Sequence, residues 1–285
     1  MASIAPAAKL AVLIDADNAS AAMIAFVLAE FAKYGTTFVK RAYGDWTSNR
    51  LNGWKPQLLQ NSIHPMQQFA YTYGKNATDS AMIIDAMDLL YSNKFDGFCI
   101  VSSDSDFTRL ASRIRESGLV VYGCGERKTP KPFVTACDKF IYVENLVPRS
   151  GTPSIEVGVA EPSTTIPLNG VSPSERPPRG HASISAFSKV IEWLREAVEA
   201  RTGEDGWAGL APVGMLMNRW HPDFDVRTYG FKKLHELMAS TGLFEFMDQR
   251  PGEGKPIVKY ARYLIDRDNG GSVDSRPTGI VSHDS

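Results

Sequence analysis

The amino-acid sequence predicts an α/β protein: an open, mostly parallel sheet with helices on both faces, followed by a small C-terminal winged helix-turn-helix domain. Strand-like and helix-like segments alternate along residues 9–147, which is typical of parallel sheets built from strand–helix–strand units. A proline-rich stretch follows, and after it three helical patterns precede two candidate strands. Three helices and a hairpin are the outline of a winged helix.

The first unit, residues 1–147, is expected to contain six strands separated by helices. Residues 19–33 repeat apolar side chains every three or four positions, as a helix does. Thr78 is expected to cap a later helix, and Gly118 to stop another in the left-handed conformation. Pro65 cannot donate a ladder hydrogen bond, so its strand is expected near a sheet edge. The expected strands are residues 9–15, 36–43, 62–69, 97–101, 119–122 and 139–143. The expected helices are residues 19–33, 52–61, 78–91, 107–117 and 130–137.

The second half of the chain is expected to divide into a linker, a folded unit and a tail. Residues 148–180 hold seven prolines among serine, threonine and glycine, so we expect a flexible linker. Residues 181–265 form the expected winged-helix unit, and residues 266–285 a disordered tail. Because the linker separates two sets of apolar residues, each unit is expected to fold on its own. The expected elements of the second unit are helices at residues 183–200, 212–220 and 226–240 and strands at residues 243–248 and 256–264.

The composition is that of a globular protein without a strong overall charge. The 285 residues are 43% hydrophobic and carry a net charge of −1, so nucleic-acid binding would rest on local basic patches. The longest apolar stretches are strand-sized, and we expect no membrane span and no signal peptide. Cys99, Cys124 and Cys137 lack the spacing of a zinc site. They are expected to be buried thiols of a cytoplasmic protein.

Two of the expected buried strands end in pairs of aspartates. Asp15 and Asp17 stand at the end of the first strand, and Asp104 and Asp106 follow the strand at residues 97–101. Parallel strands bring their carboxyl ends to one sheet edge, where such folds bind ligands. Clustered carboxylates repel one another and are costly to hold together without a cation. The sequence therefore predicts a site for Mg²⁺ or Mn²⁺.

Each acid also has a purely structural explanation. An aspartate at a strand end often forms a turn or caps a helix, as Asp17, Asn18 or Asp104 could. Asp79 stands at a helix start, where the helix dipole favours a carboxylate. Asp85 lies in mid-helix, where aspartate is unfavourable; it either points inward with a function or is half-exposed without one. Capping explains one acid at each strand end but explains two poorly.

Basic and aromatic residues are expected around these acids. Arg41, Lys75, Arg127 and Lys128 fall in or beside loops at the same sheet edge, with aromatic residues such as Trp46 among them. An acidic centre with a basic and aromatic rim suits a polyphosphate strand, whose phosphates attract cations and whose bases stack on rings. An ordinary solvated surface is the alternative explanation.

Four short motifs in the first unit carry a family resemblance. Residues 13–18 read Leu-Ile-Asp-Ala-Asp-Asn, residues 74–79 Gly-Lys-Asn-Ala-Thr-Asp, residues 85–90 Asp-Ala-Met-Asp-Leu-Leu, and residues 102–107 Ser-Ser-Asp-Ser-Asp-Phe. Together they resemble the NYN domain of the PIN-like nuclease superfamily, in its LabA-like group. The resemblance covers roughly residues 9–147. It implies a metal-dependent ribonuclease, with endonuclease action favoured.

The resemblance also implies roles for individual residues. Ser103 stands where many relatives have glycine, so we expect a shifted loop at an intact site. The spacing between Lys75 and Asp79 is longer than the common family pattern. The residues matching catalytic and metal-binding positions, which would hold Mg²⁺ or Mn²⁺, are Asp15, Asp79, Asp104 and Asp106. The secondary candidates are Asp17, Asn18, Asp85 and Ser103.

The second unit resembles a different domain. Residues 210–216 read Leu-Ala-Pro-Val-Gly-Met-Leu, and residues 229–234 read Tyr-Gly-Phe-Lys-Lys-Leu. These segments resemble the OST-HTH or LOTUS domain, a winged helix often found beside NYN domains, which implies binding of RNA or of a protein partner. Lys232 and Lys233 are the candidate RNA contacts. Residues 181–265 hold 11 Lys/Arg and 11 Asp/Glu, so strong non-specific affinity for nucleic acid is not expected.

The favoured interpretation is a metal-dependent ribonuclease that hydrolyses RNA phosphodiester bonds and recruits RNA or a partner through its C-terminal domain. A homo-oligomer is compatible with this interpretation. The first alternative is a non-catalytic RNA-binding adaptor on the same fold. The second is a metal-dependent phosphatase, because Asp15-Ala-Asp17 is similar to the Asp-x-Asp motif of haloacid dehalogenases. The residues after that motif, and the missing lysine motif, argue against the phosphatase.

Overall fold

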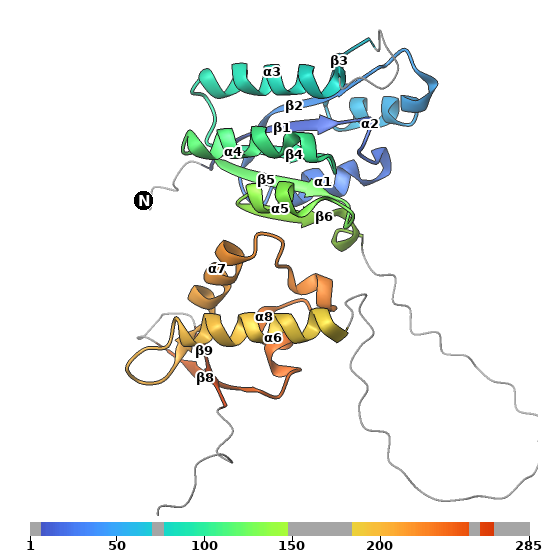
Figure 1. The fold of residues 1–285 in the computed structure, drawn as a ribbon. Coiled ribbons are helices and arrows are strands. Elements are labelled where there is room, and N and C mark those ends of the chain that lie inside the picture. Colours follow the sequence, from blue (N-terminus) through green and yellow to red (C-terminus); the bar gives the residue numbers. More distant parts are fainter. Residues whose placement is uncertain (1–6, 70–76, 148–183, 251–256, 265–285) are drawn as a thin grey trace, which may run out of the picture.

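The computed structural model describes residues 7–69, 77–147, 184–250 and 257–264. It contains a large unit built on a six-stranded sheet and a smaller helical unit with a three-stranded sheet (Figure 1). The expected linker at 148–180, the tail at 266–285 and Lys75 lie outside the described residues. Within the described ranges, no helix combines the length and apolar character needed to cross a membrane.

The large sheet is parallel throughout and follows the order β3-β2-β1-β4-β5-β6. The chain order reverses between β1 and β4, which makes this position a topological switch point where open α/β sheets bind ligands. The expected edge position of the Pro65 strand is confirmed, because β3 pairs only through its β2 side. The strands are β1 (Lys9–Asp15), β2 (Thr36–Gly44), β3 (His64–Gln67), β4 (Gly97–Val101), β5 (Val120–Gly125) and β6 (Lys139–Tyr142).

Helices cover both faces of the sheet, as expected. In β1, Ala11 and Leu13 face one core and Leu10, Val12 and Ile14 face the other, because successive strand residues alternate between faces. The first core is closed by α3 (Ala77–Tyr91), α4 (Thr108–Glu116) and α5 (Lys131–Ala136). The second is closed by α1 (Ile24–Phe31) and α2 (Trp54–Gln60).

The smaller unit has the outline expected of a winged helix. Its core gathers apolar side chains from α6 and α7, including Leu194 and Val213, with Met238 from α8 and Ala261 from β9. The antiparallel sheet has the order β7-β9-β8. The elements are α6 (Ile184–Glu199), β7 (Ala208–Gly209), α7 (Leu210–Trp220), a 3-10 turn η5 (Val226–Tyr229), α8 (Leu234–Ala239), β8 (Phe244–Gln249) and β9 (Val258–Tyr263).

Two local expectations are wrong. The helix expected over residues 226–240 is interrupted: η5 ends at Gly230, whose φ of 91° is left-handed, and α8 begins only at Leu234. Glycine adopts this conformation without a steric penalty, so it breaks a pattern that the apolar spacing alone would continue. Thr78 lies inside α3, and its hydroxyl donates to the Asp17 carboxylate at 3.1 Å instead of capping the helix.

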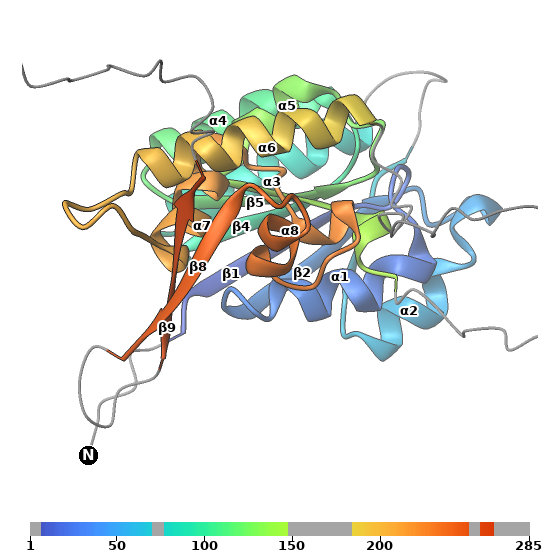
Figure 2. The same cartoon turned by 90° about the horizontal axis from the view of Figure 1, so that it is seen from below.

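The two units are in direct contact along the β6 edge of the large sheet (Figures 1 and 2). The backbone N–H of Phe140 in β6 donates to the carbonyl of Pro222 at 2.9 Å. Arg227 donates two hydrogen bonds to Glu30 of α1, at 3.0 and 2.9 Å. Further hydrogen bonds between the units join Lys131 and Tyr142 to Asp223, Lys139 to Asn218, and Asn145 to Thr228.

Candidate metal centre at the carboxyl edge of the sheet

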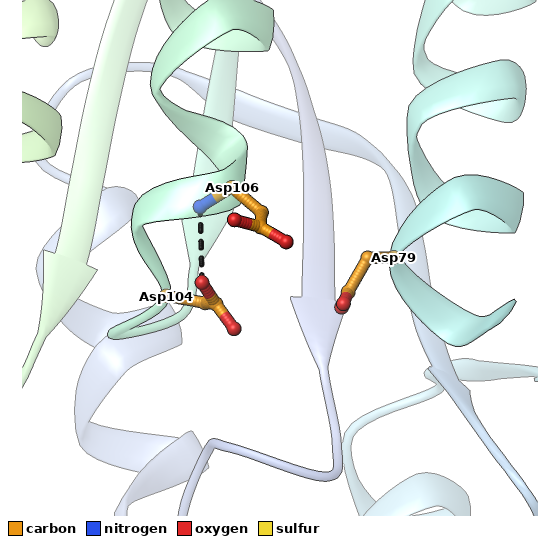
Figure 3. Close-up of side chains that lie close together, drawn as sticks. All are labelled: Asp79, Asp104 and Asp106. Carbon is orange, nitrogen blue, oxygen red and sulfur yellow. Dashed lines mark hydrogen bonds between the residues drawn. The ribbon is translucent and has the colours of Figure 1, made fainter. Parts of the chain in front are cut away.

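Three aspartates from two separate segments converge at the switch point of the sheet. Asp79, Asp104 and Asp106 each place a carboxylate oxygen within 4.8 Å of the others. Figure 3 shows Asp79 on α3 facing Asp104 and Asp106, which project from the loop that enters α4. The three carboxylates therefore meet where the sequence predicts a cation site, and their oxygen chemistry suits Mg²⁺ or Mn²⁺.

Local backbone geometry fixes Asp104 and Asp106. Asp104 follows β4 and is the N-cap of the 3-10 turn η3 (Ser105–Phe107), where its Oδ1 accepts the backbone N–H of Asp106 at 2.9 Å. The capping explanation is thus correct for one oxygen of Asp104. A carboxylate has two oxygens and several lone pairs, so the cap leaves capacity for a cation. Asp79 occupies the first turn of α3 and is 9% exposed.

Asp15 lies beside this group but is held by the protein itself. Its side chain is fully buried. Its Oδ2 accepts the Ser102 hydroxyl at 2.7 Å and the Asn18 side-chain amide at 2.8 Å. Ser102 Oγ in turn accepts the backbone N–H of Asp104 at 3.0 Å. Asp15 therefore connects the end of β1 to the loop that carries Asp104.

The electrostatics of the site favour an external cation. Burial, followed by repulsion from Asp15, Asp104 and Asp106, raises the pKa of Asp79 to about 6. Burial also raises the pKa of Asp15, although hydrogen bonds from Asn18 and Ser102 act in the opposite direction. A raised carboxyl pKa means that the negative form is disfavoured where it stands. A divalent ion would relieve that penalty.

The secondary candidates make contacts within the protein. Asp17 accepts from Arg50 at 3.1 Å and from Thr78, and so holds the start of α3 near β1. The Ser103 hydroxyl accepts the backbone N–H of Glu126 at 2.9 Å, which ties the β4 loop to the β5 loop.

Asp85 makes contacts that the sequence did not indicate. Its carboxylate accepts from the Arg41 guanidinium and the Tyr43 hydroxyl, both on β2. Asp85 thereby fastens the middle of α3 to the sheet, and Arg41 serves as its counter-ion. The contacts of Arg41 are thus those of a structural ion pair, and its side chain is 29% exposed.

The remaining basic candidates lie at the surface. Arg127 is exposed, donates to Asn145 at 3.0 Å and lies 5.5 Å over the Tyr142 ring. Lys128 is 73% exposed and pairs with Glu126. In the smaller unit, Lys232 and Lys233 are exposed just before α8.

Sequence reasoning missed two residues that organise the site, Ser102 and Thr78. Both lie in the motifs quoted above, but the sequence did not indicate their acceptors, because serine and threonine hydroxyls bond wherever geometry brings an acceptor. Ser102 is 87 positions from its acceptor Asp15, and Thr78 is 61 positions from Asp17. Only the parallel pairing of β1 with β4 and the packing of α3 bring these groups together.

Comparison with known proteins identifies both domains. Residues 9–144 match the NYN domain, and residues 185–256 match the OST-HTH/LOTUS domain. A comparison with curated proteins finds no match. Among solved structures, a protein of unknown function from Vibrio parahaemolyticus RIMD 2210633 is similar, with 18% identity, a TM-score of 0.42, and coverage of 49% of this chain and 95% of that one. An uncharacterized protein from Nitrosomonas europaea shows 27% identity and a TM-score of 0.27 over 40% of this chain and 100% of that one.

The two domain matches follow the order expected from the motifs, and they bracket the sheet unit and the winged-helix unit of the structure. The chain therefore carries an NYN domain, whose fold is PIN-like, followed by an OST-HTH/LOTUS domain.

Proposed function

We propose that this protein is a Mg²⁺- or Mn²⁺-dependent ribonuclease. The observation that carries the proposal is the convergence of Asp79, Asp104 and Asp106 within 4.8 Å at the switch point of the sheet. Ligand oxygens around one hard cation lie roughly 3–4 Å from one another, so small side-chain adjustments would let all three share an ion. The raised pKa of Asp79 supports the same assignment.

Each residue of the site has a distinct role in this proposal. Asp79, Asp104 and Asp106 would hold the cation, and Asp15 would add negative charge behind them while keeping Ser102, and through it Asp104, in place. When bound, the cation would activate a water and stabilise the leaving oxygen of a phosphodiester.

RNA as the substrate class follows from the domain pair and from the neighbouring charges. NYN and OST-HTH/LOTUS domains are both associated with RNA. Arg127 and Lys128 are exposed in the loop after β5, at the same carboxyl edge as the acids. Cations there can contact phosphates on either side of the scissile bond. Endonuclease action is the expectation that the family resemblance adds.

The test is cleavage of single-stranded RNA by the full chain. A linear RNA labelled at its 5′ end and a circular RNA of the same sequence are incubated with Mg²⁺, Mn²⁺ or EDTA. We expect cleavage of both RNAs with metal and none with EDTA. Asp104→Asn should abolish cleavage, whereas Asp88→Asn, a neutralised exposed acid on the same helix as Asp79, should not.

The other outcomes assign the alternatives. Metal-independent RNA binding without cleavage of any RNA would contradict the proposal and favour the non-catalytic adaptor. Turnover of p-nitrophenyl phosphate in place of RNA would favour the phosphatase. Cleavage of the linear RNA alone would keep the ribonuclease and replace endonuclease by exonuclease action.

A further inference from the structure

A pocket of about 190 Å³ lies between the two units, away from the acidic cluster. One wall comes from the large unit, at the loop after β5 and the end of β6. The other comes from α6 and from the segment between α7 and α8. Its lining includes Arg127, Tyr142, Trp193, Asp223, Thr228 and Tyr229. Because the pocket needs both walls, it exists only when the units are docked.

Aromatic rings dominate the lining, and contacts with neighbours orient several of them. Trp193 stacks on His221 with ring centres 3.6 Å apart and planes 16° apart. Tyr142 is fixed at its far end, where its hydroxyl donates to Asp223 at 3.1 Å. The Arg127 guanidinium covers the Tyr142 ring. Flat rings and a guanidinium plane are the surfaces on which unpaired nucleobases stack.

A carboxylate gives the pocket a polar end. Asp223 is 19% exposed and accepts from both Lys131, at 3.1 Å, and Tyr142. These bonds neutralise and orient it, and they leave lone pairs for further donors. A nucleobase edge that carries N–H groups can supply such donors.

The pocket also lies on the path that an RNA strand would take from the acidic cluster. Val101, Gly125 and Tyr142 close β4, β5 and β6, and the register of the pairs Val101–Cys124 and Gly125–Tyr142 keeps these ends level. From the end of β4 to the end of β6 is two strand spacings, about 10 Å. An RNA chain whose backbone lies at the acidic cluster would therefore reach the pocket within a few nucleotides.

We propose that this interdomain pocket binds one unpaired nucleobase of an RNA strand whose backbone lies at the acidic cluster. The inference rests on the proposed function for the identity of the ligand, but not for the existence of the site. A duplex cannot donate a base without unpairing it, so the pocket selects single-stranded segments. It also explains why the two units are held together by specific contacts.

The experiment measures binding in EDTA, so that cleavage is absent, with the full chain and a single-stranded RNA of twelve nucleotides. A series of the same RNA carries one abasic nucleotide at each successive position. We expect one position, or two neighbouring ones, to weaken binding about tenfold, which is in the range of one stacked base. We also expect the intact RNA to quench the fluorescence contributed by Trp193, measured as the difference from Trp193→Phe.

Two variants and a matched control test the location. Thr228→Phe fills the pocket, and Trp193→Leu removes a stacking surface. Each variant should bind the intact RNA about tenfold more weakly than wild type does. In each, the abasic position should no longer cause a further loss of binding. Trp220→Leu removes a tryptophan that is 42% exposed at the end of α7 and should bind as wild type does. Thermal melts establish that each variant is folded. If one pocket variant fails to fold, the other still tests the location.

Failure of the pocket can be told apart from failure of the ribonuclease. Equal binding of the whole abasic series, with Thr228→Phe and Trp193→Leu unchanged, would overturn the inference even if the wild type cleaves RNA. An abasic-sensitive, variant-sensitive interaction in a protein that never cleaves would support the pocket and overturn the ribonuclease. Saturation of the pocket by a peptide with no effect of any RNA would assign it to a protein partner and overturn the inference.

Discussion

Two groups of carboxylates in this protein have opposite electrostatic surroundings. At the contact between the units, Glu30 and Asp225 surround Arg227, which donates to both. At the sheet edge, the charges that most strongly affect Asp79 are other aspartates. Glu30 and Asp79, one from each group, are similarly shielded from solvent, at 6% and 9% exposed. The difference between these two carboxylates is therefore the counter-charge and not the burial.

The pKa values express this difference. Burial alone would raise the pKa of Glu30, but hydrogen bonds from Arg227 and Lys33 outweigh it and lower the pKa below its usual value. The pKa of Asp79 moves the other way, to about 6. Carboxylates that the protein neutralises with its own cations are part of its architecture. Carboxylates that it gathers at energetic cost are the ones that an external cation would stabilise.

The largest expected effect separates charge from structure at the sheet edge. Asp104→Asn keeps an acceptor oxygen for the Asp106 N–H, because asparagine caps helices as well as aspartate does. It removes one negative charge. We expect RNA cleavage to fall by about 100-fold or more, while the melting temperature of the metal-free protein stays equal or rises. A melting temperature several degrees lower in EDTA would show that the charge of Asp104 stabilises the metal-free fold, which contradicts repulsion among the clustered acids.

The second prediction concerns the carboxylates that Arg227 neutralises. Arg227→Ala leaves Glu30 and Asp225 without their shared partner, and loss of one member of a buried pair is strongly destabilising. Because Arg227 is 31% exposed, we expect a loss of about 2 kcal/mol, less than for a fully buried pair. Urea denaturation measures it. Arg113→Ala, which removes an exposed pair with Glu116, is the control and should leave the midpoint unchanged.

A double variant sharpens that result. Adding Glu30→Gln to Arg227→Ala removes the buried charge that the first change leaves behind. We expect part of the lost stability to return, because a neutral amide is less costly to bury than a carboxylate whose remaining counter-ion is the exposed Lys33. The ion-pair account would be contradicted if the two substitutions lowered the free energy of unfolding additively, so that the double variant lost the sum of the two single losses.

The third prediction concerns pH, and its sign follows from Asp79. With a folded pKa of about 6 against an ordinary value of 3.8, the folded protein binds this proton more tightly than the unfolded chain does. The contribution to stability is fully present below about pH 4 and is lost as the pH rises through 6. In EDTA, wild type should therefore lose stability relative to Asp79→Asn between about pH 4 and pH 6, and the difference should level off above that range.

Metal affinity should change in the opposite direction as the pH rises through 6. The cation binds the deprotonated carboxylate, so Mn²⁺ affinity should rise about tenfold from pH 5 to pH 7 and level off above it. Titration of Mn²⁺ at fixed ionic strength measures this.

Glu30 should affect folding stability in the opposite sense to Asp79. Because the pKa of Glu30 is lowered, the stability that this carboxylate contributes is lost only as the pH falls below the ordinary pKa of a glutamate. An Asp79→Asn variant that keeps the wild-type pH dependence of melting would contradict the assignment.

The sequence was sufficient to predict the parallel sheet and the edge position of β3, because these depend on local patterns. The continuous apolar runs of β1 and β4, and the acids at their ends, are visible without long-range information. The docking of the two units was not predictable in this way. Arg227 and Glu30 are 197 positions apart, and a proline-rich stretch between the units suggested independence instead of contact.

Partner choice was the other limit of sequence reasoning. Arg41 and Asp85 were each considered for a function, but the structure pairs them with each other and with Tyr43. The identity of a charged side chain does not indicate which opposite charge will be its partner in the fold. The same holds for Asp15, whose buried hydrogen bonds to Ser102 and Asn18 depend on the approach of β4 to β1.

The smallest expected effect concerns Ser103. The question is whether its hydroxyl stabilises the protein's own structure or serves the candidate cation site. Its hydroxyl accepts the Glu126 N–H, so the protein itself uses this group. Ser103→Gly should cost about 0.5–1.5 kcal/mol for the hydrogen bond, plus up to about 1 kcal/mol for the added backbone freedom. Ser105→Gly, at an exposed position of the same loop, measures the second cost separately. Cleavage by Ser103→Gly should stay within about twofold of wild type at saturating Mn²⁺. A large loss of cleavage with unchanged stability would instead place the Ser103 hydroxyl among the groups that serve the cation, because only there would its removal affect the reaction more than the fold.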